Sequence, residues 1–339
     1  MIPKSFRIEF LARRREFITL LGGAAAWPLA ARAQQRDRVR RIGIIMPYAE
    51  GDTEYGARVR ALRQELARLG WTEGANVQFD ERWTTDNMDR VRANAASLMA
   101  SNPDVVVATG GRVVPVLMRL SRSIPIVLPT SIDPVGIGWV ESLARPGGNV
   151  TGFTVLELSM FGKTLEILKQ IAPTTTRVGL IYNSDNPNSV VYSRAIKPFA
   201  SRLAVAAVDF PIHGLADIER AVASLADRAN AGVFFVPDIT TNALRADVVP
   251  LVGRHRLPAI YSEPMFVKSG GLAYYGADRL DLYRRAAGYI DRILRSEKPA
   301  ELPFQQPTKY QLLLNLSAAK ALGLELSPTL LALADEVIE

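Results

Sequence analysis

The chain has 339 residues, with 41 Lys and Arg against 34 Asp and Glu, a formal net charge of +7, two histidines and no cysteine. The absence of cysteine excludes disulfides, thiol catalysis and cysteine-based zinc sites, and two histidines leave most acid–base and nucleophilic schemes without their usual groups. Six basic and two acidic side chains lie in residues 1–33, so the rest of the chain has 35 basic and 32 acidic residues. This near balance of charge gives no reason to expect nucleic acid as a partner.

Residues 1–33 have the pattern of a twin-arginine signal peptide. Arg14-Arg15 precedes an apolar run from Phe17 to Ala31, and Ala31-Arg32-Ala33 forms a small-residue cleavage pattern. The run is shorter and more interrupted than the roughly 20 apolar residues that span a bilayer. An uncleaved N-terminal anchor is the alternative. We expect export of the folded chain and a periplasmic location.

The chain after residue 33 repeats one structural plan. Each half opens with a short apolar strand, continues with an amphipathic helix and adds two buried-type strands. The predicted strands are 41–47, 104–109 and 124–128 in the first half, and 177–183, 231–236 and 257–261 in the second. Such strands alternating with helices indicate parallel sheets covered on both faces, so we predict an α/β fold of two Rossmann-like lobes.

Two breaker-rich segments mark the predicted lobe boundaries. The first lies near Arg145–Gly152 and the second near Gly270–Gly276. We therefore expect lobe 1 at 39–150 with a return segment near 277–300. Lobe 2 is expected at 151–276, with the C-terminal segment 301–339 packing near the lobe junction.

Candidate ligand-binding residues follow from the strand order, because ligands of open parallel sheets bind at the carboxyl ends of the strands. These ends are rich in hydroxyl, amide and acidic groups that hydrogen-bond a polar solute. The predicted binding residues are Tyr48, Gly110, Gly111, Ser131, Asp133, Asn183, Ser184, Asn188, Asp238 and Glu263.

Three features among these positions can be interpreted in two ways. The Asn-rich segment 183–189 joins a strand to a helix N-terminus, which either offers free N–H groups to an anion or forms an ordinary capped turn. Asp238 either receives a ligand ammonium or caps the next helix. The Gly110-Gly111 pair either lets the backbone approach a ligand or forms a tight turn.

Enzyme and cofactor motifs are not found. Gly136 and Gly138 begin a G-x-G, but Glu141 stands where a dinucleotide-binding loop requires its third glycine, and neither a Walker loop nor a G-x-S-x-G elbow occurs. We expect a binding protein without cofactor or metal.

Several strings resemble the ABC-transporter substrate-binding family that includes tryptophan- and tyrosine-binding proteins and has the type I periplasmic binding fold. The similarity extends along nearly the whole chain after the signal. It is carried by Arg41–Ile44, Ser131–Gly136, Arg145–Gly152 with its Pro-Gly-Gly-Asn-Val-Thr-Gly string, Val178–Asn183 and Glu297–Ala300.

The resemblance implies a solute, an amino acid or a related organic acid, held between two lobes and delivered to an ABC permease in the inner membrane. The ligand carboxylate would meet Asn183, Ser184 and Asn188, and the ligand amine would meet Asp238. A monomer is expected. The alternatives are a sensor-type binding protein for a membrane receptor and a periplasmic enzyme on the same scaffold.

Overall fold

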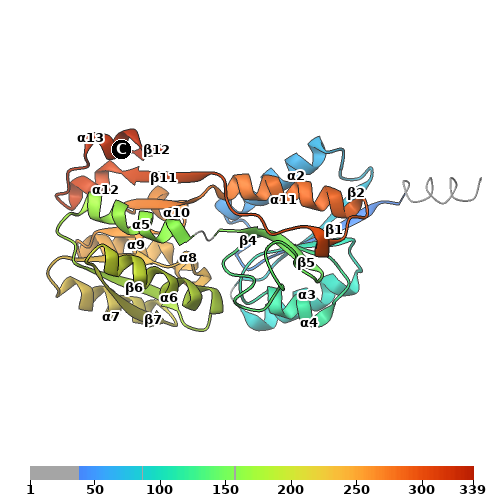
Figure 1. Ribbon diagram of the computed structural model, residues 1–339, viewed down its shortest axis with the longest axis horizontal. Helices are drawn as coiled ribbons and strands as arrows, with labels where there is room; N and C mark the ends of the chain where they lie inside the picture. The colour runs from blue at the N-terminus through green and yellow to red at the C-terminus, as the bar shows by residue number, and fades with distance from the viewer. Residues whose placement is uncertain (1–37, 86, 156–157) are drawn as a thin grey trace, which may run out of the picture.

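The computed structural model describes residues 38–85, 87–155 and 158–339, which form two α/β lobes side by side (Figure 1). The predicted fold class is confirmed. The predicted signal peptide, residues 1–33, lies outside the described residues. In the described ranges, the helices are all too short or too polar to cross a membrane.

Lobe 1 is built on a five-stranded parallel sheet with the order β2-β1-β3-β4-β5. Ile42, Ile44 and Ile45 of the interior strand between β2 and β3 are fully buried. The strands are β1 (Arg40–Met46), β2 (Val77–Trp83), β3 (Val105–Ala108), β4 (Ile126–Ser131) and β5 (Val150–Thr154). Its helices are α2 (Thr53–Arg68), α3 (Met88–Ala100), α4 (Val114–Leu120) and the returning α11 (Arg279–Leu294).

Two helix pairs cover the faces of this sheet. The helices α2 and α11 pack together on one face, and α3 and α4 pack together on the other (Figure 1). Asp52 begins α2 by accepting hydrogen bonds from the backbone N–H groups of Glu54 and Tyr55. Apolar side chains at helical spacing, such as Val59 and Leu62, then face the sheet.

Lobe 2 is built on a seven-stranded sheet with the order β12-β11-β10-β9-β8-β6-β7, in which only the β10–β11 pair is antiparallel. The strands are β6 (Arg177–Asn183), β7 (Ala206–Ile212), β8 (Ala231–Phe235), β9 (Ala259–Tyr261), β10 (Ala273–Ala277), β11 (Tyr310–Asn315) and β12 (Glu336–Ile338). The helices are α5 (Leu158–Ile171), α6 (Pro187–Arg202), α7 (Leu215–Ala226), α8 (Ile239–Ala243), α9 (Arg245–Arg254), α10 (Pro264–Lys268), α12 (Leu316–Ala321) and α13 (Pro328–Ala332). The short helix η1 (Pro299–Glu301) follows α11 and lies against β5 of lobe 1.

The lobe boundaries differ in two places from those expected. Residues 150–154 are the fifth strand of lobe 1, because their backbone pairs with the free edge of β4, so the first crossing follows Thr154. The C-terminal segment first packs on lobe 1, where Thr151 Oγ1 of β5 donates to the carbonyl of Leu302 at 2.7 Å and the N–H of Gln305 donates to the carbonyl of Gly152 at 3.1 Å. From Tyr310 onward it extends the lobe 2 sheet instead, because the edge of β10 pairs with β11.

Candidate functional site

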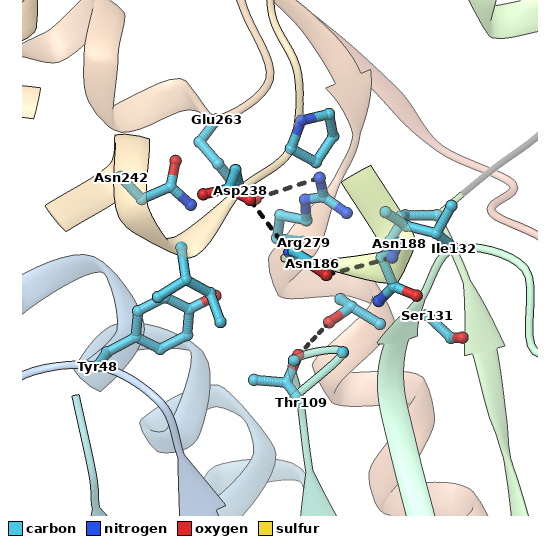
Figure 2. A pocket seen from close by; sticks show the side chains of 16 residues that line it. Tyr48, Thr109, Ser131, Ile132, Asn186, Asn188, Asp238, Asn242, Glu263 and Arg279 are labelled. Atoms are coloured by element: carbon cyan, nitrogen blue, oxygen red, sulfur yellow. Dashed lines mark hydrogen bonds and ion pairs between the residues drawn. The ribbon is translucent and has the colours of Figure 1, made fainter. Parts of the chain in front are cut away.

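A cavity lies between the lobes at the carboxyl ends of both sheets (Figure 2). The space beside its lining atoms, including the part that is open to solvent, measures about 470 Å³. Lobe 1 and the first crossing contribute Tyr48, Thr109, Gly110, Gly111, Thr130, Ser131, Ile132 and Val155, and lobe 2 and the second crossing contribute Asn186, Asn188, Pro237, Asp238, Ile239, Asn242, Glu263 and Arg279.

The lobe 1 wall combines hydroxyl groups with one aromatic ring. The Thr109 and Thr130 hydroxyls, at the ends of neighbouring strands, share a hydrogen bond of 2.6 Å. Tyr48 follows β1 and stacks on Tyr55 of α2. Burial raises the pKa of Tyr48 well above its ordinary value, so its hydroxyl is neutral and available for hydrogen bonding.

Asp238 is the central acidic group of the lobe 2 wall and is 4% exposed. One carboxylate oxygen caps α8 by accepting from the backbone N–H of Thr240 at 2.8 Å. The other accepts from the Ser189 hydroxyl at 2.8 Å and from the Asn186 amide at 3.2 Å. Burial raises the pKa of Asp238 above its ordinary value, although these donors favour the ionised form. Asp238 therefore combines the capping role with a place on the cavity wall.

The N-terminus of α6 has no free N–H groups in its first turn. Pro187 carries none, the N–H of Asn188 is bonded to Asn186 Oδ1, and the N–H of Ser189 is bonded to the Asn186 carbonyl. The expected use of this turn as an anion site through free N–H groups therefore lacks its donors, because Asn186 caps the helix with both its side chain and its carbonyl.

Three of the predicted site residues lie away from the cavity wall. Asn183 donates to Thr240 Oγ1 at 2.9 Å and accepts from the N–H of Asp185 at 2.8 Å, so its side chain braces the turn. Ser184 is exposed on that turn. Asp133 accepts from the N–H of Gly136 at 2.8 Å and closes its own turn. The cavity brings together the other seven: Tyr48, Gly110, Gly111, Ser131, Asn188, Asp238 and Glu263.

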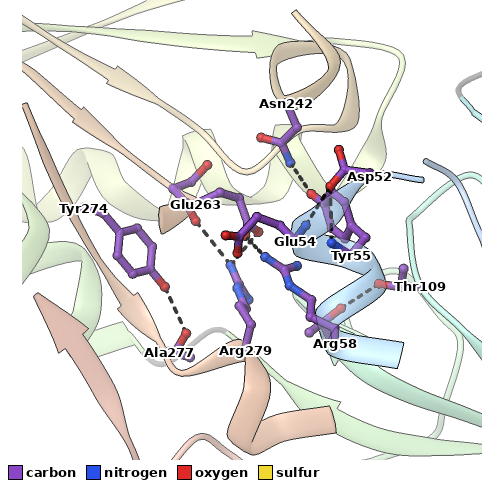
Figure 3. Close-up of polar contacts among 12 residues, drawn as sticks. Asp52, Glu54, Tyr55, Arg58, Thr109, Asn242, Glu263, Tyr274, Ala277 and Arg279 are labelled. Carbon is purple, nitrogen blue, oxygen red and sulfur yellow. Dashed lines mark hydrogen bonds and ion pairs between the residues drawn. The ribbon is translucent and has the colours of Figure 1, made fainter. Parts of the chain in front are cut away.

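A buried charged cluster joins the lobes beside the cavity (Figure 3). The Glu263 carboxylate, on the turn after β9, forms ion pairs with two guanidinium groups. The N···O distance is 2.5 Å to Arg58 of α2 and 3.2 Å to Arg279 of α11. All three side chains are less than 9% exposed. Burial by itself raises the pKa of Glu263, but Arg279 and Arg58 outweigh it and hold the pKa below its ordinary value.

Sequence reasoning missed both arginines. Arg279 follows the strand β10, which was not predicted, and Arg58 was taken as part of an ordinary amphipathic helix. A signal was present for Arg58, because it lies three residues after Tyr55 and four before Leu62, on the buried face of α2.

The lobes are closed on one another, because atoms of lobe 2 lie close to the Gly110-Gly111 turn of lobe 1. A Cβ atom at Gly111 would lie 2.7 Å from Asn186 Oδ1 and 2.9 Å from Asn188 Nδ2. Gly110 has a φ of +94°, and a Cβ there would lie 3.2 Å from Ile239 Cδ1. The missing Cβ atoms of the Gly110-Gly111 turn therefore allow side chains of the opposite lobe to approach closely, and Gly110 also has a positive φ.

Two ion pairs close the rim of the same interface. Arg245 contacts Asp52 at 3.0 Å, and Lys268 contacts Glu54 at 3.0 Å. Partly exposed pairs of this kind contribute about 0–1 kcal/mol, because water screens them.

We therefore expect Lys268→Gln to shift the balance between closed and open lobes by fivefold at most. Small-angle X-ray scattering of the variant and the wild type at equal ionic strength measures the lobe separation. A wide opening in the variant would show that the rim, and not the buried cluster, keeps the lobes closed.

Four buried polar atoms of the cavity lining have no hydrogen-bond partner within the described chain. They are Ser131 Oγ, Asn188 Oδ1, Asn242 Oδ1 and Arg279 Nε. Buried polar groups are almost always hydrogen-bonded in folded proteins, so these atoms suit a polar molecule in the cavity. Among the described residues, His, Asp and Glu nowhere gather in threes as a metal site requires.

Comparisons with known proteins agree with this architecture. The model of the family described as ABC transporter substrate binding protein matches residues 42–338. The tyrosine-binding protein of Clostridioides difficile (strain R20291) is 26% identical over 264 residues, which is 77% of this chain and 74% of that relative.

Solved structures show the same fold. An ABC domain in complex with L-Trp from Streptococcus pneumoniae has 23% identity and a TM-score of 0.82, over 88% of this chain and 99% of that chain. A ligand-free, open structure of a substrate binding protein with adhesive properties from Clostridium difficile has 24% identity and a TM-score of 0.67, over the same shares. The two-lobed architecture is that of type I periplasmic binding proteins.

Proposed function

The chain belongs to the ABC transporter substrate binding protein family, and from this membership we propose that it is the solute-binding component of an ABC importer. The proposed solute is an amino acid or a related organic acid, held between the lobes. Binding would favour the closed arrangement over an open one, which is a population shift between two states of the lobes.

The observation that carries this proposal is the interlobe cavity with its buried polar atoms. Seven predicted positions meet there, four lining atoms have no partner among the described residues, and Asp238 lies on the wall as a buried carboxylate. One relative reported above is named a tyrosine-binding protein, and one similar solved structure is a complex with L-Trp, which supports amino acids as the first compounds to test.

Thermal unfolding with a panel of amino acids and aromatic organic acids tests the proposal. A ligand present at 100 times its Kd stabilises the folded state by about 2.7 kcal/mol. Recovery of the bound compound unchanged supports a binding protein, and its conversion would instead support an enzyme. The proposal fails if no compound of the panel raises the unfolding temperature.

The proposed location is the periplasm, and the proposed partner is an ABC permease that receives the solute from the monomeric protein. Residues 1–33 support this location through the twin-arginine pattern. We expect replacement of Arg14 and Arg15 by Lys to retain the protein in the cytoplasm, because the pair is the recognition element of that export route. Cell fractionation measures this, and unchanged export would indicate another route.

A further inference from the structure

The charges around the cavity are arranged as two separate poles. Asp238 is the negative pole: in the described part of the chain it is hydrogen-bonded by Ser189, Asn186 and Thr240, none of which carries a charge. A buried carboxylate with only neutral donors is suited to a cationic group of a ligand.

The charged cluster is the positive pole. Arg58 and Arg279 share the single carboxylate of Glu263, so the three side chains together carry one net positive charge. Removing such a charge from water is costly unless an anion accompanies it. The net positive charge of the cluster is therefore neutralised when a second negative group lies beside it.

Arg279 is the arginine of the cluster that lines this cavity, beside Glu263. One of its terminal nitrogens contacts Glu263 at 3.2 Å and the carbonyl of Ser262 at 3.4 Å. Its Nε is buried and has no partner in the described chain, and the residue is 7% exposed. Guanidinium groups present several N–H donors in one plane, so Arg279 can hold Glu263 and a second carboxylate at once.

Closure of the lobes prepares this guanidinium for a ligand. Arg58 lies on α2 of lobe 1 and Glu263 on the turn after β9 of lobe 2, so their contact forms only when the lobes meet. Without Arg58, Arg279 alone would neutralise Glu263. With Arg58 in place, Arg279 has positive charge left for another anion.

Resting on the proposed function, we propose that the solute is a zwitterionic α-amino acid whose carboxylate is bound by Arg279 and whose amine is bound by Asp238. The N-terminus of α6 is not this carboxylate site, because its first N–H groups are bonded within the protein. Arg279 is thus the residue that distinguishes free acids from their neutral derivatives.

Calorimetric titration of matched acid and amide pairs tests the assignment. The probes are L-tyrosine, L-tryptophan and L-leucine, each with its carboxamide, which keeps the amine and side chain but loses the carboxylate charge. For the wild type we expect each amide to bind at least tenfold more weakly than its acid, because a charge-assisted hydrogen bond is lost. Equal affinity within a pair would overturn the proposal without any variant.

Arg279→Lys then locates the carboxylate, because lysine keeps a positive charge for Glu263 but lacks the Nε donor. We expect the variant to bind the free acid at least tenfold more weakly and the amide within threefold of the wild type. Arg245→Lys is the matched control: it makes the same change in an interlobe ion pair outside the cavity, and both ligands should keep their affinities.

The outcomes separate this assignment from the proposed function. Binding of an amino acid with equal losses for acid and amide in Arg279→Lys would overturn the role of Arg279 and leave the solute-binding function standing. Failure of all three acids and their amides to bind the wild type would overturn the amino-acid function together with this assignment. Circular dichroism of the variant establishes that a loss of binding is not a loss of fold.

Discussion

Asp238→Asn is expected to weaken binding of an amine-bearing solute by about ten- to a hundredfold, because a charge-assisted hydrogen bond contributes about 1.5–3 kcal/mol. Asparagine is as good an N-cap as aspartate, so α8 keeps its cap from this position. Asp238→Ala loses the cap as well as the charge and should weaken binding at least as much.

Titration with L-tyrosine and with 3-(4-hydroxyphenyl)propionate, which lacks the amine, measures this effect. The variant should lose affinity for the amino acid far more than for the plain acid. Asp185→Asn is a suitable control, since it removes an exposed carboxylate of the same lobe outside the cavity. Equal affinity of the wild type for both compounds would show that Asp238 does not recognise an amine.

Gly111→Ala is expected to weaken binding of the same amino acid by about five- to 150-fold, because overpacking a close contact costs about 1–3 kcal/mol. Its Cβ would lie within 3 Å of Asn186 Oδ1 and Asn188 Nδ2. Asn186 cannot easily move aside, because its side chain is bonded to Asp238 and to the N–H of Asn188. The added methyl group is therefore crowded only when the lobes are closed, because both residues that it would meet belong to lobe 2.

Two measurements separate this mechanism from a general loss of stability. Small-angle scattering with ligand should show more open lobes in Gly111→Ala than in the wild type, while the unfolding temperature without ligand stays close to that of the wild type. Gly148→Ala adds the same methyl group at an exposed glycine with no atom within 4 Å. Wild-type affinity in Gly111→Ala would show that the lobes close less tightly during binding than in this structure.

The predicted part of the fold consists of its central strands. The strands β1, β3, β4, β6, β8 and β9 are continuous apolar runs, and a run buried on both faces is visible in a sequence without its neighbours. The edge strands β2 and β7 are mostly half-buried, so their sequences show no comparable run. Their pairing with β1 and β6 depends on an edge that only the assembled sheet provides.

The site shows the same division. Gly110, Gly111, Ser131 and Asp238 were predicted because the end of a parallel strand is a local feature that the chain carries in its own pattern. Asn183 ends one strand and Asp133 follows another, but their side chains close local turns, and a strand end does not specify where a side chain points.

The sequence by itself determined the α/β class and the strand ends at which polar groups gather, because apolar periodicity and turn residues are local properties. The family was identified separately, from residue strings along the chain and from the family model that matches residues 42–338. Only the tertiary structure decided which polar groups meet and which charges remain unpaired. Arg58 and Glu263 are 205 residues apart and come from different lobes, so their pairing depends on the closure of one lobe on the other. The third partner, Arg279, arrives only because the chain returns to lobe 1 after β10, and that return is decided by the packing of α11 on α2.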